Sequence, residues 1–204
     1  DQYPRVIKAL KQDIMASNGH LDTGIFGTQF FFEVLSENGM HDLAYEAINK
    51  KEEPGYGRWL ALGSTTTREE WGEGGSHNHP MFGGGLVWFY RKLAGMNADP
   101  EIPGYRHIIF RPQPVDELSY VKFFNQTPCG EAGIHWINEK DQLSVNVTVP
   151  VGSRATVCVP VLKGKQITES GNEIAGSENI KFIKEEEDYK VYEVQSGHYT
   201  FQSR

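Results

Sequence analysis

The stretch NADPEIPGY, residues 97–105, separates two parts of the chain that follow different hydrophobic periods. Two prolines and a glycine in so short a segment are typical of a boundary between domains. Apolar residues recur at helical spacing before it and alternate as in short strands after it. We therefore expect two domains, one at residues 1–103 and one at residues 104–204.

The first part of the chain is predicted to be helical. The segment PRVIKALKQDIMA, residues 4–16, predicts a helix with one buried face. That face would hold Val6, Ile7, Leu10 and Ile14. Further helices are predicted in TQFFFEVLSENG, HDLAYEAINK and GLVWFYRKLAG. In the first of these three, the expected buried residues are Phe30, Phe31, Val34 and Leu35.

The second part of the chain consists of short β-branched and aromatic segments that are separated by turn residues. In QLSVNVTVP, residues 142–150, apolar side chains alternate with polar ones, so one face of the strand is expected to be buried. The buried side chains would be Leu143, Val145, Val147 and Val149. Repeated strands of this kind predict an antiparallel β-sandwich or jelly roll.

Composition excludes several classes of protein. With 20 Lys and Arg against 27 Asp and Glu, the net charge is −7, which disfavours nucleic acid as a partner. No run of apolar residues is long enough to span a membrane. Only Cys129 and Cys158 are present, so a disulfide framework is excluded, although the two can pair or stay free. The chain does not begin with methionine, which suggests a piece of a longer polypeptide, and the cellular compartment stays open.

The stretch TTTREEWGEGGSHNHPMFG, residues 65–83, gathers carboxylates and imidazoles between two predicted helices. Three interpretations compete. His77 and His79 could share a metal ion with a glutamate, but no further ligand cluster lies close, and we expect no metal and no cofactor. The residues could also belong to an ordinary solvated loop. In the third interpretation a carboxylate activates water in carbohydrate hydrolysis, and aromatic rings stack on the sugar.

Aromatic residues near this stretch provide candidate sugar platforms. They are Tyr56, Trp59, Trp71, Phe82 and Trp88. Trp88 lies inside a predicted helix and is better explained by core packing. Trp71 is flanked by glycine and carboxylates and is the stronger candidate for a sugar contact.

Four sequence blocks in this order resemble the C-terminal portion of bacterial α-L-rhamnosidases, glycoside hydrolase family 78. The blocks are GHLDTGIFGTQFFFEVLSENGMHDLAYEAI, GSTTTREEW, SHNHPMFGGGLVWFYRKLAG and PGYRHIIFRPQP. The resemblance covers nearly the whole chain and is strongest from His20 to Pro114. It implies the second half of an (α/α)6 helical barrel, followed by a C-terminal antiparallel β-sandwich.

The resemblance also implies roles for particular residues. The family pattern TT-x-W-E-x-W falls on residues 65–71, which places Glu69, and not Glu70, at the general base of these inverting enzymes. The family's Asn-His pair falls on Asn78 and His79, which implies sugar contacts. Trp71 would wall the pocket.

Two positions in these blocks differ from the family pattern. Arg68 stands where the family usually has tryptophan. Tyr56 follows a proline and a glycine where the family commonly has a tryptophan, and it is also expected to line the substrate site.

The general acid of the family lies in the first half of the barrel, and no block here resembles that acidic motif. The expected partners are therefore a rhamnoside substrate and the missing N-terminal part of the same polypeptide, and a homo-oligomer is possible. Two alternatives stay open. The chain could be another (α/α)6-barrel glycosidase, or a non-catalytic carbohydrate-binding module. That module would use Trp136, Tyr120 and Phe123 as exposed aromatics, although core packing explains these three better.

Overall fold

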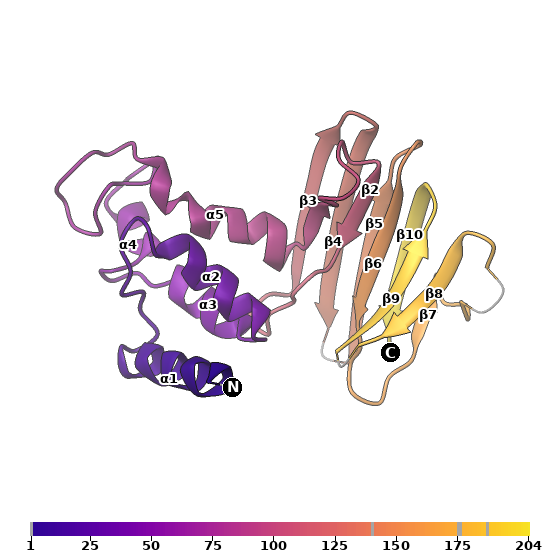
Figure 1. Ribbon diagram of the computed structural model, residues 1–204, viewed down its shortest axis with the longest axis horizontal. Coiled ribbons are helices and arrows are strands. Elements are labelled where there is room, and N and C mark those ends of the chain that lie inside the picture. The colour runs from indigo at the N-terminus through magenta and orange to yellow at the C-terminus, as the bar shows by residue number, and fades with distance from the viewer. Residues whose placement is uncertain (1, 140, 175–176, 187) are drawn as a thin grey trace. The chain divides into compact units, whose positions relative to one another are not determined.

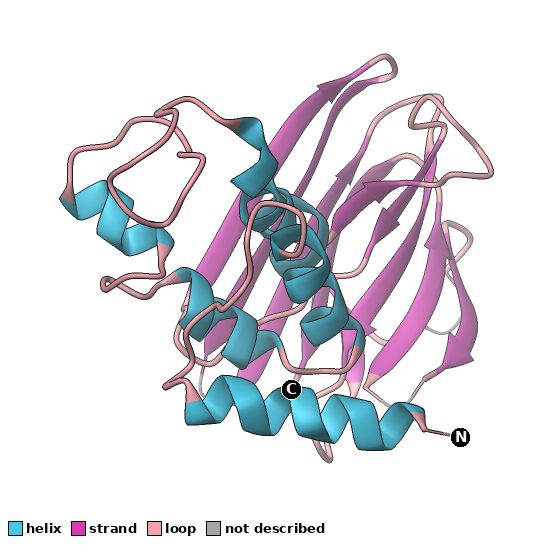
Figure 2. Cartoon of the chain, turned by 60° about the vertical axis from the view of Figure 1, so that its left-hand side comes forward, coloured by secondary structure: helices cyan, strands magenta, loops and turns pink. Residues whose placement is uncertain are grey.

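The computed structural model describes residues 2–139, 141–174, 177–186 and 188–204. They divide into two compact units on either side of the bond between Trp88 and Phe89. The α-helices belong to the first unit and the strands to the second (Figures 1 and 2). This order of helices and strands confirms the predicted change of period. The domain limits 1–103 and 104–204 stay a prediction.

The first unit is built from short helices. They are α1 (Tyr3–Ala16), α2 (Thr28–Glu37), α3 (His41–Ile48), α4 (Tyr56–Ala61), the 3-10 turn η1 (Pro80–Gly83) and α5 (Gly84–Trp88). Within the described part of the chain, no helix combines the length and the apolar character that crossing a membrane requires.

Helix α2 packs against α5 and α3 at the centre of the first unit. The indole of Trp88 lies against Phe32, with ring centroids 5.9 Å apart, and its Nε1 donates to Ser36 Oγ at 2.6 Å. Because this hydrogen bond satisfies both polar groups, a serine and a tryptophan nitrogen can be buried together. Trp88 is therefore a core residue, as its position in the sequence predicts.

The buried faces of α1 and α2 differ from the predicted ones. On α2 the structure buries Thr28, Phe31, Phe32, Leu35 and Ser36. The side chain of Phe30 is 56% exposed, because two small polar residues complete the buried face in its place. On α1 only Ile14 is buried, and Val6 is 59% exposed. The prediction of one fully buried face on α1 was therefore wrong.

Glycine is required where α5 begins. A Cβ added to Gly84 would lie 2.5 Å from Gln29 Cα, whereas one added to Gly83 would meet nothing within 4 Å. We expect Gly84→Ala to lower the free energy of unfolding by about 1–3 kcal/mol, because backbone must move to admit the methyl group. The gain in helix propensity, about 1 kcal/mol at most, is too small to offset this cost.

Urea unfolding followed by circular dichroism would measure the effect. The matched control, Gly83→Ala, should stay within about 0.5 kcal/mol of the parent chain. Equal stability of the two variants would show that α2 and α5 do not approach as closely as described.

The second unit begins with a π-helical turn, η2 (Phe89–Leu93), and continues as strands. They are β1 (Met96–Ala98), β2 (His107–Phe110), β3 (Tyr120–Thr127), β4 (Gly130–Glu139), β5 (Gln142–Val149), β6 (Arg154–Pro160), β7 (Ile167–Glu169), β8 (Ile180–Glu185), β9 (Tyr189–Val194) and β10 (Gly197–Ser203).

These strands form two sheets, which Figure 1 shows as layers of the second unit. One sheet has the order β1-β2-β6-β9-β8, and the other has the order β3-β4-β5-β10-β7. All described pairs are antiparallel except the parallel pair of β2 and β6. The unit is a β-sandwich with β7 and β8 as edge strands.

The sandwich core confirms the predicted alternation along residues 142–150. Leu143, Val145, Val147 and Val149 are all buried. Trp136 on β4 is fully buried, and its Nε1 donates to Leu93 O at 2.8 Å. The two cysteines are free; Cys158 is buried and Cys129 is half-buried.

Candidate active site

The loop between α4 and η1 folds back on itself and brings the predicted site residues close along the backbone. The N–H of Glu69 donates to Ser76 O at 2.9 Å, and the N–H of His79 donates to Thr67 O at 2.8 Å. The hydroxyl groups of Thr66 and Thr67 add hydrogen bonds to the carbonyl oxygens of His77 and His79. Residues 66–69 and 76–79 therefore lie side by side, with Glu69 on one of these two paired segments and His79 on the other.

Glycine lets the turn of this loop pass over the Glu69 side chain. Gly75 has a φ of 67°, and a Cβ there would lie 3.1 Å from Glu69 Cβ and 3.2 Å from Glu69 Oε2. An L side chain would be strained in this conformation and crowded in this place. The glycine-rich sequence is thus needed for the chain reversal that holds Glu69.

The carboxylate of Glu69 is exposed but held. Its Oε2 accepts a hydrogen bond from the N–H of Ser76 at 2.9 Å. One hydrogen bond fixes the side chain and leaves the other oxygen for a water molecule or a substrate. An anchored, solvent-facing carboxylate of this kind can act as a general base.

The neighbouring carboxylates differ from Glu69. Glu70 is exposed, and no hydrogen bond to a described residue holds its carboxylate. Glu73 is 74% exposed and lies 3.6 Å from Arg58, a distance and an exposure at which an ion pair contributes little. The loop therefore distinguishes Glu69 from the other two by a backbone hydrogen bond.

The half-buried ring of His79 has an open polar position. Its Nδ1 is buried and has no hydrogen-bond partner among the described residues. His77 is exposed, and its Nε2 lies 3.3 Å from Glu73 O. Asn78 is exposed, and its N–H donates to Ser76 Oγ at 3.2 Å. Since a buried ring nitrogen usually has a partner, the unpartnered Nδ1 distinguishes His79 from the exposed His77.

Trp71 ties the loop to an aromatic cluster. Its ring stacks on Trp59 with centroids 4.8 Å apart and lies 4.3 Å from Phe82. Its Nε1 donates to Thr23 O at 2.7 Å. The ring is half-buried, so it is fixed by packing while part of it remains accessible. A rigid, partly accessible tryptophan suits a sugar-stacking wall.

Tyr56 supports this cluster from the buried side. It is buried, and its hydroxyl donates to Phe82 O at 2.5 Å. Burial raises the pKa of the Tyr56 phenol well above its usual range, so the group stays a neutral donor. Its ring lies 5.3 Å from Trp71. The tyrosine therefore positions both Phe82 and Trp71.

Sequence reasoning did not predict the structural roles of Ser76 and Arg68 in this loop. Ser76 supplies the N–H that holds Glu69, and this backbone role leaves no signal in the residue type. Arg68 is only 6% exposed, and its Nε donates to Ser64 Oγ at 2.9 Å, which fixes the start of the loop.

Among the residues that the structure describes, no group of three His, Cys, Asp or Glu side chains could hold a metal ion. The pair His77 and His79 does not converge with a third ligand there, because the hydrogen bonds of the loop hold the two residues in different environments. The chemistry of the loop is that of a carboxylate, an imidazole and stacked aromatic rings.

Comparison with known proteins agrees with these features. Residues 1–93 match the model of the bacterial α-L-rhamnosidase 6-hairpin glycosidase domain, and residues 95–173 match that of the bacterial α-L-rhamnosidase C-terminal domain. The first of these models describes a six-hairpin glycosidase domain, and all the α-helices of the first unit fall within its match. The chain belongs to the bacterial α-L-rhamnosidase family.

Individual relatives support this assignment. An α-L-rhamnosidase of Alteromonas sp. strain LOR is 32% identical over 158 residues, which are 72% of this chain and 17% of that protein. The structure of an α-L-rhamnosidase from Dictyoglumus thermophilum superposes with a TM-score of 0.87 at 36% identity, over 97% of this chain and 23% of that one. The Streptomyces avermitilis α-L-rhamnosidase complexed with L-rhamnose gives a TM-score of 0.82 at 27% identity, over 96% and 19%. The chain thus spans about a fifth of the length of these relatives. The superpositions confirm the predicted fold class.

Proposed function

We propose that this chain is the C-terminal part of an inverting glycoside hydrolase that cleaves terminal α-L-rhamnosyl linkages in glycosides or polysaccharides. One observation carries the proposal. The loop holds the solvent-exposed carboxylate of Glu69 by a backbone hydrogen bond. Trp71, whose ring is anchored by its own hydrogen bond, lies two residues further along the chain. His79 lies on the segment that pairs with the segment of Glu69. The Streptomyces avermitilis relative, which was solved with L-rhamnose, supports the choice of sugar.

In this proposal Glu69 is the general base. It takes a proton from a water molecule as that water attacks the anomeric carbon from the face opposite the leaving group. The sugar–oxygen bond breaks, the leaving oxygen receives a proton from a separate general acid, and the anomeric configuration inverts. His79 and Asn78 hydrogen-bond the sugar, and Trp71 walls the pocket. That Tyr56 also contacts the sugar stays a prediction. In the structure its hydroxyl donates to Phe82 O.

The general acid is proposed to come from the N-terminal part of the same polypeptide. An inverting enzyme needs its two carboxyl groups about 6.5–9.5 Å apart, with room for the water between them. Glu70 is adjacent to Glu69 and exposed, and it is not a suitable second group. Exposed apolar side chains of the helical unit, such as Phe30 and Leu86, offer surface on which further helices of the same barrel can pack.

The reaction can be tested with p-nitrophenyl α-L-rhamnoside. We expect the longest form of the enzyme to release β-L-rhamnose first, as seen by proton NMR before mutarotation, because inversion converts the α linkage to the β sugar. On methyl α-L-rhamnopyranoside, whose methoxide leaving group needs a proton, this chain alone should be nearly inert, since loss of the acid removes about 10²–10⁴-fold in rate. Release of the α anomer would exclude the inverting mechanism, and full activity of this chain on the methyl rhamnoside would exclude a missing acid.

The structure weakens the alternative of a binding module that uses the sandwich aromatics. Trp136 is fully buried, so it cannot stack on a ligand without unfolding the core. Phe123 lies against Tyr90, with ring centroids 4.9 Å apart, and Tyr120 is exposed. These three residues therefore do not form one platform.

A further inference from the structure

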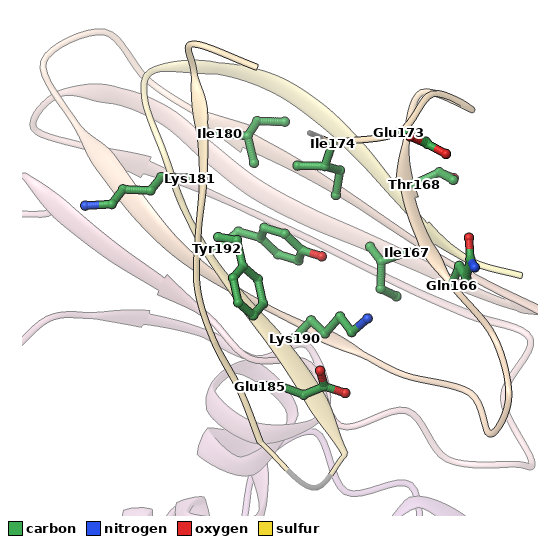
Figure 3. Close-up of a pocket in the computed structure, with 11 residues that line it drawn as sticks. Gln166, Ile167, Thr168, Glu173, Ile174, Ile180, Lys181, Glu185, Lys190 and Tyr192 are labelled. Atoms are coloured by element: carbon green, nitrogen blue, oxygen red, sulfur yellow. The ribbon is translucent and has the colours of Figure 1, made fainter. Parts of the chain in front are cut away.

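A cavity of about 570 Å³ lies at the open edge of the β-sandwich, between the two sheets. Its walls come from β7 with Glu173 and Ile174 on one side, and from β8 and β9 on the other. Figure 3 shows Ile167 and Ile174 facing Tyr192 and Ile180 across this space. The volume falls in the range of about 300–1,000 Å³ that is usual for small-molecule sites.

The hydroxyl of Tyr192 carries the argument. The residue is only 4% exposed, and its oxygen forms no hydrogen bond with the residues that the structure describes. Figure 3 shows this oxygen directed into the cavity, toward Ile167. Other buried tyrosines of the same unit behave differently, because Tyr189 donates to Pro112 O and Tyr199 to Gln195 O, each at 3.0 Å. The Tyr192 oxygen therefore keeps its hydrogen-bonding capacity for a molecule in the cavity, whereas the hydroxyl groups of Tyr189 and Tyr199 are used within the protein.

The remaining lining combines apolar side chains, neutral polar ones and two residues of each charge, which are Glu173, Glu185, Lys181 and Lys190. The ring of Phe182 is half-exposed, and its centroid lies 5.8 Å from that of Tyr192. The buried hydroxyl of Thr168 also has no partner among the described residues. Glu185 and Lys190 lie together at one end of the cavity in Figure 3, so their opposite charges do not favour an ion of either sign.

A ligand that fits these groups has an apolar face, several hydroxyl groups and no net charge. We propose that the cavity binds a neutral pyranose sugar, with the Tyr192 hydroxyl donating a hydrogen bond to a sugar oxygen and Phe182 lying against the ring. Burial raises the pKa of Tyr192 to about 12, so the phenol remains a donor at neutral pH. The choice of a rhamnoside as the first probe rests on the proposed function, whereas the cavity chemistry suits any neutral pyranose.

The test is to titrate the ¹⁵N-labelled chain with methyl α-L-rhamnopyranoside and to record the amide chemical shifts at each concentration. We expect saturable shifts at Ile167, Ile180 and Tyr192. Tyr192→Phe deletes one hydrogen bond and should weaken binding by about 2- to 10-fold. The matched control Tyr199→Phe deletes a hydroxyl that already has a partner outside the cavity, and it should leave the affinity unchanged.

Two further variants make the result decisive. Phe182→Ala should also weaken binding, and it is informative if Tyr192→Phe unfolds. Glu69→Gln should leave the shifts in the cavity of this chain unchanged, whereas the same substitution in the longest form of the enzyme should abolish hydrolysis, so failure of the proposed reaction is separated from failure of this site. Absence of saturable shifts with rhamnoside, glucoside and galactoside, or unchanged affinity in both cavity variants, would overturn the proposal.

Discussion

Replacing Glu69 by glutamine in the longest form of the enzyme is expected to lower kcat by about 10²–10⁴-fold. Glutamine has the size of glutamate but cannot accept a proton from water at neutral pH. Its side-chain oxygen can still accept the N–H of Ser76, which holds the carboxylate at 2.9 Å in the parent chain. The variant should therefore fold normally and lose the chemical step.

The control for this variant is Glu70→Gln. Both positions are exposed glutamates in the same loop, but no hydrogen bond to a described residue holds Glu70. We expect its kcat on p-nitrophenyl α-L-rhamnoside to stay within a few-fold of the parent enzyme, and KM to change little in either variant. A large loss in Glu70→Gln together with normal turnover in Glu69→Gln would show that the base has been assigned to the wrong neighbour.

The members of this candidate site were proposed from the sequence, and their roles stay predictions. Residue types alone point to Glu69, Glu70, Trp71, His77 and His79 among glycines, and the family resemblance selects Glu69 and His79 among the carboxylates and imidazoles. What joins them could not be predicted, because it consists of backbone contacts. The Ser76 N–H that holds Glu69 would be the same for almost any residue at position 76.

In the fold, too, sequence periodicity predicts some buried residues, whereas others depend on contacts with distant parts of the chain. Alternation along residues 142–150 predicted the buried side of β5 correctly, since a strand in a sandwich has one inner face. The buried face of α2 was predicted one residue out of place, because Thr28 and Ser36 belong to it. Thr28 Oγ1 donates to Gly24 O and Ser36 Oγ accepts from Trp88, so both are buried with satisfied hydrogen bonds. Hydrophobicity cannot reveal such pairs, because each depends on a partner elsewhere in the chain.

The cavity in the sandwich could not be predicted from sequence at all. Its lining residues come from separate strands, and each looks like an ordinary strand residue in its own segment. Tyr192 differs from Tyr199 only in where its hydroxyl points, which depends on how the edges of the two sheets are closed.

Truncating Trp136 to alanine is expected to cost the second unit about 3–5 kcal/mol of stability. The indole is fully buried, so its removal leaves a cavity in the core of the sandwich. The carbonyl of Leu93 would also lose its donor at 2.8 Å and would keep only the longer hydrogen bond from the N–H of Gln113 at 3.4 Å, which adds to the cost. Urea unfolding followed by the β-sheet signal in circular dichroism would measure the change.

Tyr120→Ala is the matched control, because both residues are aromatic and both were candidates for a sugar platform on the sandwich. Tyr120 is 61% exposed, and its truncation should change stability by no more than about 0.5 kcal/mol. The contrast decides between the two readings of Trp136. A core residue loses stability when truncated, whereas a ligand platform loses affinity in a protein that stays folded. A Trp136→Ala variant as stable as Tyr120→Ala, with weaker sugar binding, would restore the binding-module hypothesis for these aromatics.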